Sequence, residues 1–345
     1  MFPIEHFLYN ADQYNLLSYT GQYFHGATGF IGRKVLDCLK KKNVKITILS
    51  RSHDPQKTAN ISYVHADLKD FSTTDSALKN QRIDYIFHLA SLPGDTGNPI
   101  EMVQTNVIGT QNILEIARTH KIKRMVLVSS TSAYGWYPAT PFQIPEYLPV
   151  DEKHPCYTKD IYSSTKRIQK ILALTYFYEY RVPVTCLRLS AVVGPDGCGG
   201  GRSWYTFAEQ LAKSDIVQIP HFTFDEQCHY VDIRDVVRMI IHASISSNAE
   251  GEIFNCCGEK PTTGYEFKEI IQKHFPWIKV ECGFPWSMAQ GKVIEFSMKK
   301  AQDYMDFTPL YTLEDSIIYI KKWINSGGLQ KHIPEQDRYT AGIQQ

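Results

Sequence analysis

Four short runs of apolar residues recur through the first half of the chain. They cover Val44–Leu49, Ile83–Ala90, Arg124–Ser130 and Val182–Ser190, and they are rich in Val and Ile on both of their faces. Short runs of this kind are typical of strands that helices cover on both sides of a parallel sheet. We therefore predict a buried parallel sheet built from these segments.

Between these runs, apolar residues recur at helical spacing instead. One such pattern follows Gly29 and reaches toward Asn43, a residue type that often ends a helix. Two others cover residues 101–120 and 163–180. Strands and helices that alternate in this way predict an α/β fold with a Rossmann-type, doubly wound parallel sheet.

The pattern changes after Pro195, where a glycine-rich loop is followed by shorter mixed elements. We expect four parts: an N-terminal extension (1–22), a NAD(P)-binding Rossmann domain (23–194), a smaller C-terminal substrate-binding lobe (195–325) and a polar tail (326–345). The lobe is expected to interleave with the Rossmann domain, and the tail to be loosely ordered.

The composition is ordinary for a globular enzyme, and the charge balance excludes some classes of binding partner. The 345 residues are 43% hydrophobic and 21% charged, and 37 basic against 36 acidic side chains leave a net charge of +1. Such a balance provides no overall field for nucleic acid or an anionic membrane. No apolar run approaches the roughly 20 residues of a membrane span, and the start of the chain lacks the layout of a signal peptide. The eight cysteines form no C-x-x-C pair, which favours reduced thiols in the cytoplasm. We expect a small-molecule substrate and no metal site.

A glycine-rich turn at residues 23–32, YFHGATGFIG, follows a short polar strand and opens the first helix. Gly26, Gly29 and Gly32 have G-x-x-G-x-x-G spacing, which permits a tight turn and close approach of the backbone to a pyrophosphate. The free N–H groups and the positive dipole end of the helix then face the phosphates. This pattern predicts a dinucleotide site that includes Phe30 and Ile31.

The second strand ends in Ser50 and Arg51, and no acidic residue stands there. At this point an acid binds the ribose 2′-hydroxyl of NAD, whereas an arginine accommodates the 2′-phosphate of NADP. We therefore expect NADP(H) to be favoured over NAD(H). The alternative is that Arg51 is a solvated loop charge.

Tyr162 and Lys166 are four residues apart in DIYSSTKR, so on a helix they share a face, with Asp160 or Thr158 as the N-cap. Tyrosine has a pKa near 10 and is a poor base unless a neighbouring cation favours its phenolate. Ser130 closes a strand, so its hydroxyl emerges at the carboxyl edge of the sheet, where open α/β folds bind ligands. We predict that Tyr162 is the acid and base, that Lys166 favours its phenolate, and that Ser130 polarises the substrate carbonyl.

Over roughly residues 22–322 the chain resembles the extended short-chain dehydrogenase/reductase superfamily, in its NAD(P)-dependent epimerase/dehydratase branch. The motifs that carry the resemblance occur in the family's order: GATGFIG, HADLKD, FHLAS, QTNVIGTQNILEIA, SSTSAYG, YSSTK, LRLSAVVGP and HYVDIRDVVR. Each motif is modest, but the ordered set is specific. The resemblance implies that Asp67 and Leu68 bracket the adenine and that Asn106 is the family's structural asparagine.

The resemblance also assigns residues to the two ligands. Those implied to bind the cofactor are Gly26, Gly29, Phe30, Ile31, Gly32, Ser50, Arg51, Asp67, Leu68, Leu89, Ala90, Ser91, Lys166, Leu189 and Val192. Those implied to face the substrate are Ser130, Tyr162, Val193 and Arg202. It further implies a homodimer through the helices that carry QTNVIGTQNIL and YSSTKRIQKIL.

Two departures from the family pattern bear on the reaction. Family 4,6-dehydratases carry an Asp-Glu pair directly after the catalytic hydroxyl residue, and this chain has Thr131 and Ser132 there. These cannot act as carboxylic acid and base, so we expect no dehydration of that type. Many nucleotide-sugar members grip the diphosphate with an arginine at the position of Cys228. Three basic residues could substitute for it: Arg202, Lys213 and Arg234.

We therefore predict a NAD(P)(H)-dependent oxidoreductase that acts on a secondary alcohol or ketone of a sugar or sugar-like metabolite. One alternative is a nucleotide-sugar epimerase that oxidises and re-reduces its substrate on one tightly held NAD. Another is a non-catalytic, cofactor-sensing protein of the same fold, against which the joint presence of Ser130, Tyr162 and Lys166 argues.

Overall fold

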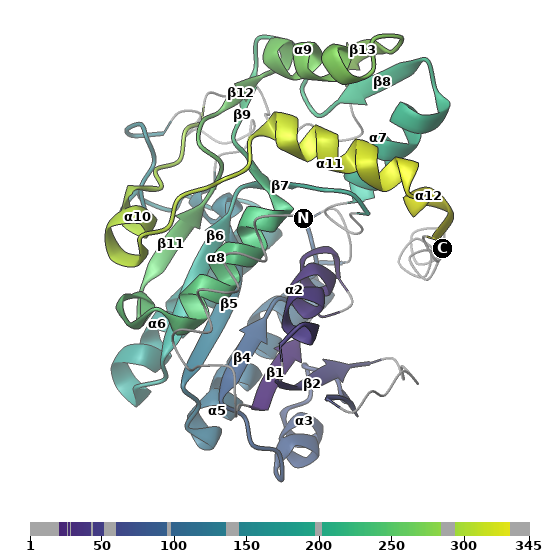
Figure 1. Cartoon of the computed structure of the whole chain (residues 1–345). Coiled ribbons are helices and arrows are strands. Elements are labelled where there is room, and N and C mark those ends of the chain that lie inside the picture. Colours follow the sequence, from purple (N-terminus) through teal and green to yellow (C-terminus); the bar gives the residue numbers. More distant parts are fainter. Residues whose placement is uncertain are drawn as a thin grey trace.

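The computed structural model describes residues 21–25, 27, 29–42, 44–51, 60–94, 98–135, 145–196, 202–283 and 294–331. Its centre is a parallel sheet of seven strands in the order β11-β6-β5-β4-β1-β2-β3 (Figure 1). The strands are β1 (Gly21–His25), β2 (Lys45–Ser50), β3 (Ile61–His65), β4 (Tyr85–His88), β5 (Arg124–Ser130), β6 (Val184–Leu189) and β11 (Ile253–Cys256). The predicted fold class is confirmed.

The four predicted strands correspond to β2, β4, β5 and β6. The strand at Arg124–Ser130 has the predicted bounds, whereas β4 and β6 are shorter than predicted because their flanking residues leave the sheet as loops. β4, β5 and β6 are buried almost throughout, as expected of strands with helices on both faces.

Helices cover both faces of the sheet. On one face, α2 (Phe30–Lys40) and α8 (Ile233–Ile245) pack into one apolar core with the strands. On the other face, α3 (Phe71–Leu78), α5 (Gly109–His120) and α6 (Ile161–Tyr180) enclose a second core. The predicted helix at 101–120 is one helical segment in three parts, α4 (Pro99–Val103), a π-helical turn η2 (Gln104–Ile108) and α5.

The lobe has an apolar core of its own, which includes Trp204, Phe207, Phe267 and Ile317. Its elements are α7 (Arg202–Lys213), β8 (Ile216–Ile219), β9 (Gln227–Cys228), β12 (Thr262–Thr263), α9 (Gly264–His274), β13 (Lys279–Cys282), α11 (Leu313–Asn325) and α12 (Gly328–Lys331) (Figure 1). Three segments beyond Pro195 belong to the sheet and its covering helices instead, and α8 is one of them. β11 pairs with β6, and α10 (Lys299–Met305) packs on the sheet beside it.

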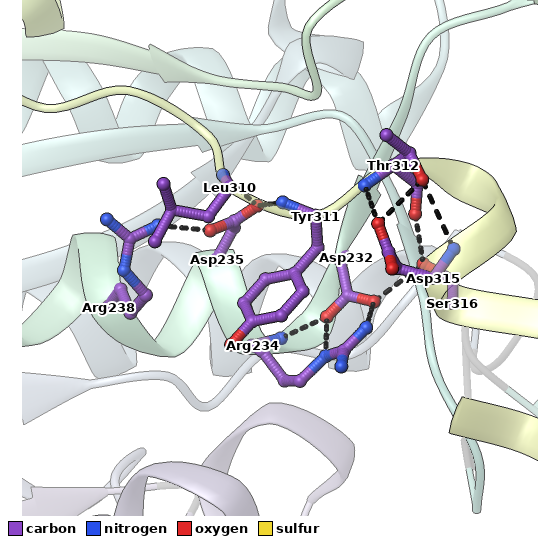
Figure 2. A network of polar contacts seen from close by, with 9 residues as sticks. All are labelled: Asp232, Arg234, Asp235, Arg238, Leu310, Tyr311, Thr312, Asp315 and Ser316. Atoms are coloured by element: carbon purple, nitrogen blue, oxygen red, sulfur yellow. Dashed lines mark hydrogen bonds and ion pairs between the residues drawn. The ribbon is translucent and has the colours of Figure 1, made fainter. Parts of the chain in front are cut away.

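A buried polar joint links the lobe to α8 (Figure 2). Asp232, which ends β10 (Tyr230–Asp232), receives two hydrogen bonds of 2.8 Å from the Arg234 guanidinium and one of 2.6 Å from Ser316 Oγ. Asp235 accepts hydrogen bonds of 2.9 Å from the backbone N–H groups of Leu310 and Tyr311. Because β10 pairs with β7 (Ala191–Val193) just after β6, this joint fixes the lobe against the carboxyl edge of the sheet.

Candidate active site

The described start of α2 has the backbone that a pyrophosphate site needs. Gly29 is the N-cap of α2, in an extended conformation, and no side chain among the described residues is seen to cap the helix. Uncapped N–H groups at a helix start are free to bind anionic oxygens. Phe30 and Gly32 are buried and Ile31 is half-buried, whereas Gly26 lies outside the described residues. The site therefore fits a dinucleotide phosphate by its own geometry.

The loop after β7 packs directly on this helix start. A Cβ at Gly194 would lie 2.5 Å from Ile233 Cγ2 and 3.2 Å from the Phe30 ring, so only glycine fits there without a shift. Leu189 is buried at the end of β6, and Val192 and Val193 follow it in β7. The segment predicted to meet nicotinamide and substrate thus lies beside the predicted pyrophosphate turn.

The residues predicted to bind the adenine half of the cofactor lie at the ends of β2 and β3. Ser50 ends β2 half-buried, and Arg51 follows it exposed. Asp67 accepts a hydrogen bond of 3.0 Å from the backbone N–H of Lys69. Leu68 is buried, and its carbonyl oxygen accepts a hydrogen bond of 2.6 Å from Asn112 Nδ2. These residues share the carboxyl edge of the sheet with the glycine turn.

The π-helical turn places Asn106 between two parts of the site. Its amide accepts a hydrogen bond of 2.8 Å from Leu92 N and donates to Leu92 O at 3.0 Å. It also donates to Thr165 Oγ1 at 3.1 Å. Asn106 therefore ties α6 to the loop after β4, which carries the half-buried Leu89, Ala90 and Ser91. Widened turns of this kind are frequent at functional sites.

Tyr162 and Lys166 lie on the first turns of α6, as their spacing predicts. Asp160, one of the two predicted caps, starts the helix by accepting a hydrogen bond of 2.8 Å from Ser163 N. Lys166 is only 3% exposed. Its Nζ donates to Val128 O at 3.2 Å and lies 5.7 Å from the centroid of the Tyr162 ring.

Burial lowers the pKa of Lys166 to about 8. No ion pair among the described residues includes its ammonium group. At neutral pH the amine of Lys166 therefore remains largely protonated, and it lies beside the Tyr162 phenol. A cation so placed favours the phenolate form of the tyrosine.

Ser130 ends β5 and caps a short 3-10 turn, η3 (Thr131–Tyr134), against which α6 packs. Its Oγ accepts a hydrogen bond from Ser132 N at 3.1 Å and donates to Ser132 Oγ at 3.0 Å. Ser130, Tyr162 and Lys166 thus come together at one edge of the sheet. The sequence did not predict that Ser132 pairs with Ser130. Two hydroxyl residues two positions apart after a strand are too common to predict such a hydrogen bond.

Few of the residues considered for binding a substrate diphosphate have a free positive charge in the structure. Cys228 is buried, and burial raises its pKa to about 12, so it is a neutral thiol. Arg234 is held by Asp232, and Lys213 pairs on the surface with Glu209 at 3.1 Å. Two of the three candidate substitutes for the diphosphate-binding arginine are therefore engaged elsewhere. The side chain of the third, Arg202, lies outside the described part of the structure.

Two features are absent from the described residues. No helix there combines the length and apolar character that crossing a bilayer requires. No group of three His, Cys, Asp or Glu side chains in these segments is placed to hold a metal ion.

Comparison with known proteins places this geometry in a family. The model of the "NAD dependent epimerase/dehydratase family" matches residues 24–257. An uncharacterized protein of Methanocaldococcus jannaschii is 28% identical over 269 residues, covering 76% of this chain and 79% of its own. A UDP-glucuronate 4-epimerase of Thermodesulfobacterium geofontis is 25% identical over 316 residues, covering 86% and 94%.

The fold also matches solved structures. UDP-glucose 4-epimerase of Thermotoga maritima superimposes with a TM-score of 0.76 at 20% identity, over 89% of this chain and 99% of the other. At that identity the match shows the shared fold alone. Since the family model covers more than half of the residues, the chain belongs to the NAD-dependent epimerase/dehydratase family and is an enzyme of the short-chain dehydrogenase/reductase type.

Proposed function

We propose that this chain epimerises a secondary alcohol of a nucleotide sugar, by oxidising and re-reducing it on one bound nicotinamide cofactor. The observation that carries the proposal is the buried ammonium of Lys166 beside Tyr162 at the edge that Ser130 closes. The family match and the UDP-sugar 4-epimerase among its relatives support epimerisation over the one-way reduction that the sequence favoured.

In this proposal Tyr162 takes the proton of the substrate hydroxyl during oxidation and gives it back during reduction. Lys166 favours the phenolate by its charge and holds the nicotinamide ribose. Ser130 donates a hydrogen bond to the reacting oxygen. Ser132 supplies the second hydroxyl of the hydrogen-bonded pair that it forms with Ser130. When bound, NAD supplies the hydride acceptor. Thr131 and Ser132 provide no carboxylic acid, which agrees with epimerisation rather than dehydration.

Arg51 favours a second candidate, a reductase that draws on NADPH. It is exposed directly after β2, and neither Ser50 nor Arg51, the two residues at this strand end, is acidic. A charge-assisted bond to a 2′-phosphate is worth about 1.5–3 kcal/mol, which is roughly 10- to 150-fold in dissociation constant. For this second candidate we propose that NADP(H) binds at least about tenfold more tightly than NAD(H).

The proposed assembly is a homodimer. Ile100, Val103 and Ile108 are exposed on α4 and η2, and Ile168 and Ile171 are exposed on α6, which packs beside them. Exposed apolar side chains gathered on helices that pack together commonly mark an interface. An Ile171→Glu substitution should give a monomer in light scattering. An unchanged mass would reject this interface.

The proposed compartment is the cytoplasm. All seven cysteines within the described segments are free thiols, which supports a reducing environment.

The nucleotide that stays with the purified protein tests the proposed reaction. An epimerase need not exchange its cofactor, so mass spectrometry of the denatured protein should find close to one dinucleotide per chain. A reductase would release its cofactor in every cycle. Purification without bound dinucleotide, with turnover that depends on added NADPH, would favour the reductase.

A further inference from the structure

A buried arginine lies beside η3, the turn that Ser130 caps. No carboxylate of the described residues pairs with it. Arg188, the second-to-last residue of β6, is 0% exposed. Its Nη2 donates to Cys156 Sγ at 3.5 Å, whereas Nε and Nη1 donate to no atom of the described residues. The guanidinium carbon lies 4.4 Å from the centroid of the Tyr134 ring.

A guanidinium taken fully out of water is costly unless an opposite charge compensates it. The Tyr134 ring contributes a cation–π contact, which is only partial compensation. Glu152 is the nearby carboxyl group, but its Oε1 accepts a hydrogen bond of 2.7 Å from Asn255 N, and burial raises its pKa. Two acidic groups act on Arg188 directly: the Tyr134 phenol, whose pKa burial raises, and the partly exposed thiol of Cys156.

The other described cysteines lack this environment. Five are buried, and burial raises the pKa of each: Cys38, Cys186, Cys228, Cys256 and Cys257. Cys282 is partly exposed like Cys156, but burial and Glu226 raise its pKa. Within the described residues, Cys156 alone combines partial exposure with a hydrogen bond from a guanidinium. Reactive cysteines occupy partly exposed, electropositive sites of this type.

We propose that Cys156 is a site of covalent thiol modification by small-molecule disulfides, with Arg188 holding its thiolate. The thiol releases its proton to solvent, and the thiolate attacks one sulfur of the disulfide. A bond forms between Cys156 Sγ and that sulfur as the original S–S bond breaks. The second sulfur leaves as a thiolate, so Cys156 is oxidised to a mixed disulfide while half of the reagent is reduced.

The position of Cys156 joins the two catalytic elements. The next residue, Tyr157, donates its backbone N–H to Tyr134 O at 2.9 Å, and Tyr134 ends the turn that Ser130 begins. Six residues after Cys156, Tyr162 lies in the first turn of α6. A group attached at Cys156 would therefore stand beside the segment that connects Ser130 to Tyr162.

Alkylation kinetics test the proposal without any substrate. The full chain is treated with iodoacetamide near pH 7, and peptide mass spectrometry follows each cysteine over time. Cys156 should react at least about tenfold faster than Cys282, because its sulfur accepts a hydrogen bond from a guanidinium and occupies an electropositive, partly exposed site. Arg188→Met should slow Cys156 to about the rate of Cys282. Arg124→Met, which removes a buried arginine from the opposite end of the neighbouring strand β5, should leave the rate unchanged.

Oxidised glutathione should then form a mixed disulfide at Cys156 that dithiothreitol removes. Equal rates for Cys156 and Cys282 in the unmodified chain would overturn the proposal, even if Arg188→Met failed to fold. A rate at Cys156 that Arg188→Met leaves unchanged would overturn it as well.

Discussion

The buried joint in Figure 2 allows a stability prediction with a worked magnitude. Replacing Asp232 by Asn keeps the shape of the side chain and removes its charge. The Asp232 side chain is 0% exposed and that of Arg234 is 10% exposed, so Asp232→Asn leaves a guanidinium buried without its counter-ion. Breaking a buried pair in this way costs about 3–5 kcal/mol.

The chain length converts this cost into a temperature. An unfolding entropy of about 2.1 cal/mol/K per residue gives about 0.7 kcal/mol/K for 345 residues. Asp232→Asn should therefore lower the Tm by about 4–7 °C. Circular dichroism melts at one fixed protein and cofactor concentration measure it, because bound cofactor and dimerisation also shift the Tm.

A matched control is available on the surface. Asp303 pairs with Lys299 at 2.8 Å, but the two side chains are 48% and 76% exposed. Such pairs contribute about 0–1 kcal/mol, so Asp303→Asn should change the Tm by less than about 1.5 °C. If Asp232→Asn shifted the Tm no more than Asp303→Asn does, the joint would not hold the lobe in the way described.

Three further predictions concern the candidate active site. Tyr162→Phe should reduce turnover at least about a hundredfold, the low end for a lost acid–base group, with little change in cofactor affinity by fluorescence titration. Near-normal turnover would show that another group moves the proton. Arg51→Asp should shrink or invert the preference for NADPH over NADH, and equal affinities in the unmodified chain would refute a role for Arg51. Because burial lowers the pKa of Lys166 to about 8, its ammonium is lost as the pH rises through 8, so cofactor affinity should fall between about pH 7 and 9. An affinity that stays constant across that range would argue against contact between Lys166 and the cofactor.

The sequence predicted those parts of the fold that have a clear local pattern of apolar and polar residues. β5 was found at its bounds because both of its faces are apolar and a run of hydroxyl residues follows it. β3 was missed, since its burial varies along the strand and it has only five residues. β11 was missed because four residues, far along the chain, join the sheet only through pairing with β6.

The candidate site shows the same division. The four-residue spacing of Tyr162 and Lys166 is a local property of a helix, and it was predicted. The π-helical turn was not, because its local sequence is that of a plain helix and its clearest contacts, from Asn106 to Leu92 and Thr165, are made across the fold. Arg234 was a candidate for binding the substrate diphosphate, but its guanidinium pairs with Asp232 at the start of α8. A single sequence contains no pattern that shows which acidic and basic side chains will be buried together as a pair.

The central claim is that the chain moves a hydride out of and back into one sugar carbon, with Tyr162 as the acid and base. The most direct test incubates the purified protein with UDP-glucose and UDP-glucuronate and without added cofactor, and follows the C4 epimers by proton NMR. The account predicts that the unmodified chain forms the 4-epimer of at least one substrate and that Tyr162→Phe does so at least about a hundredfold more slowly. No epimer from either sugar, together with consumption of added NADPH on a ketone substrate, would contradict it.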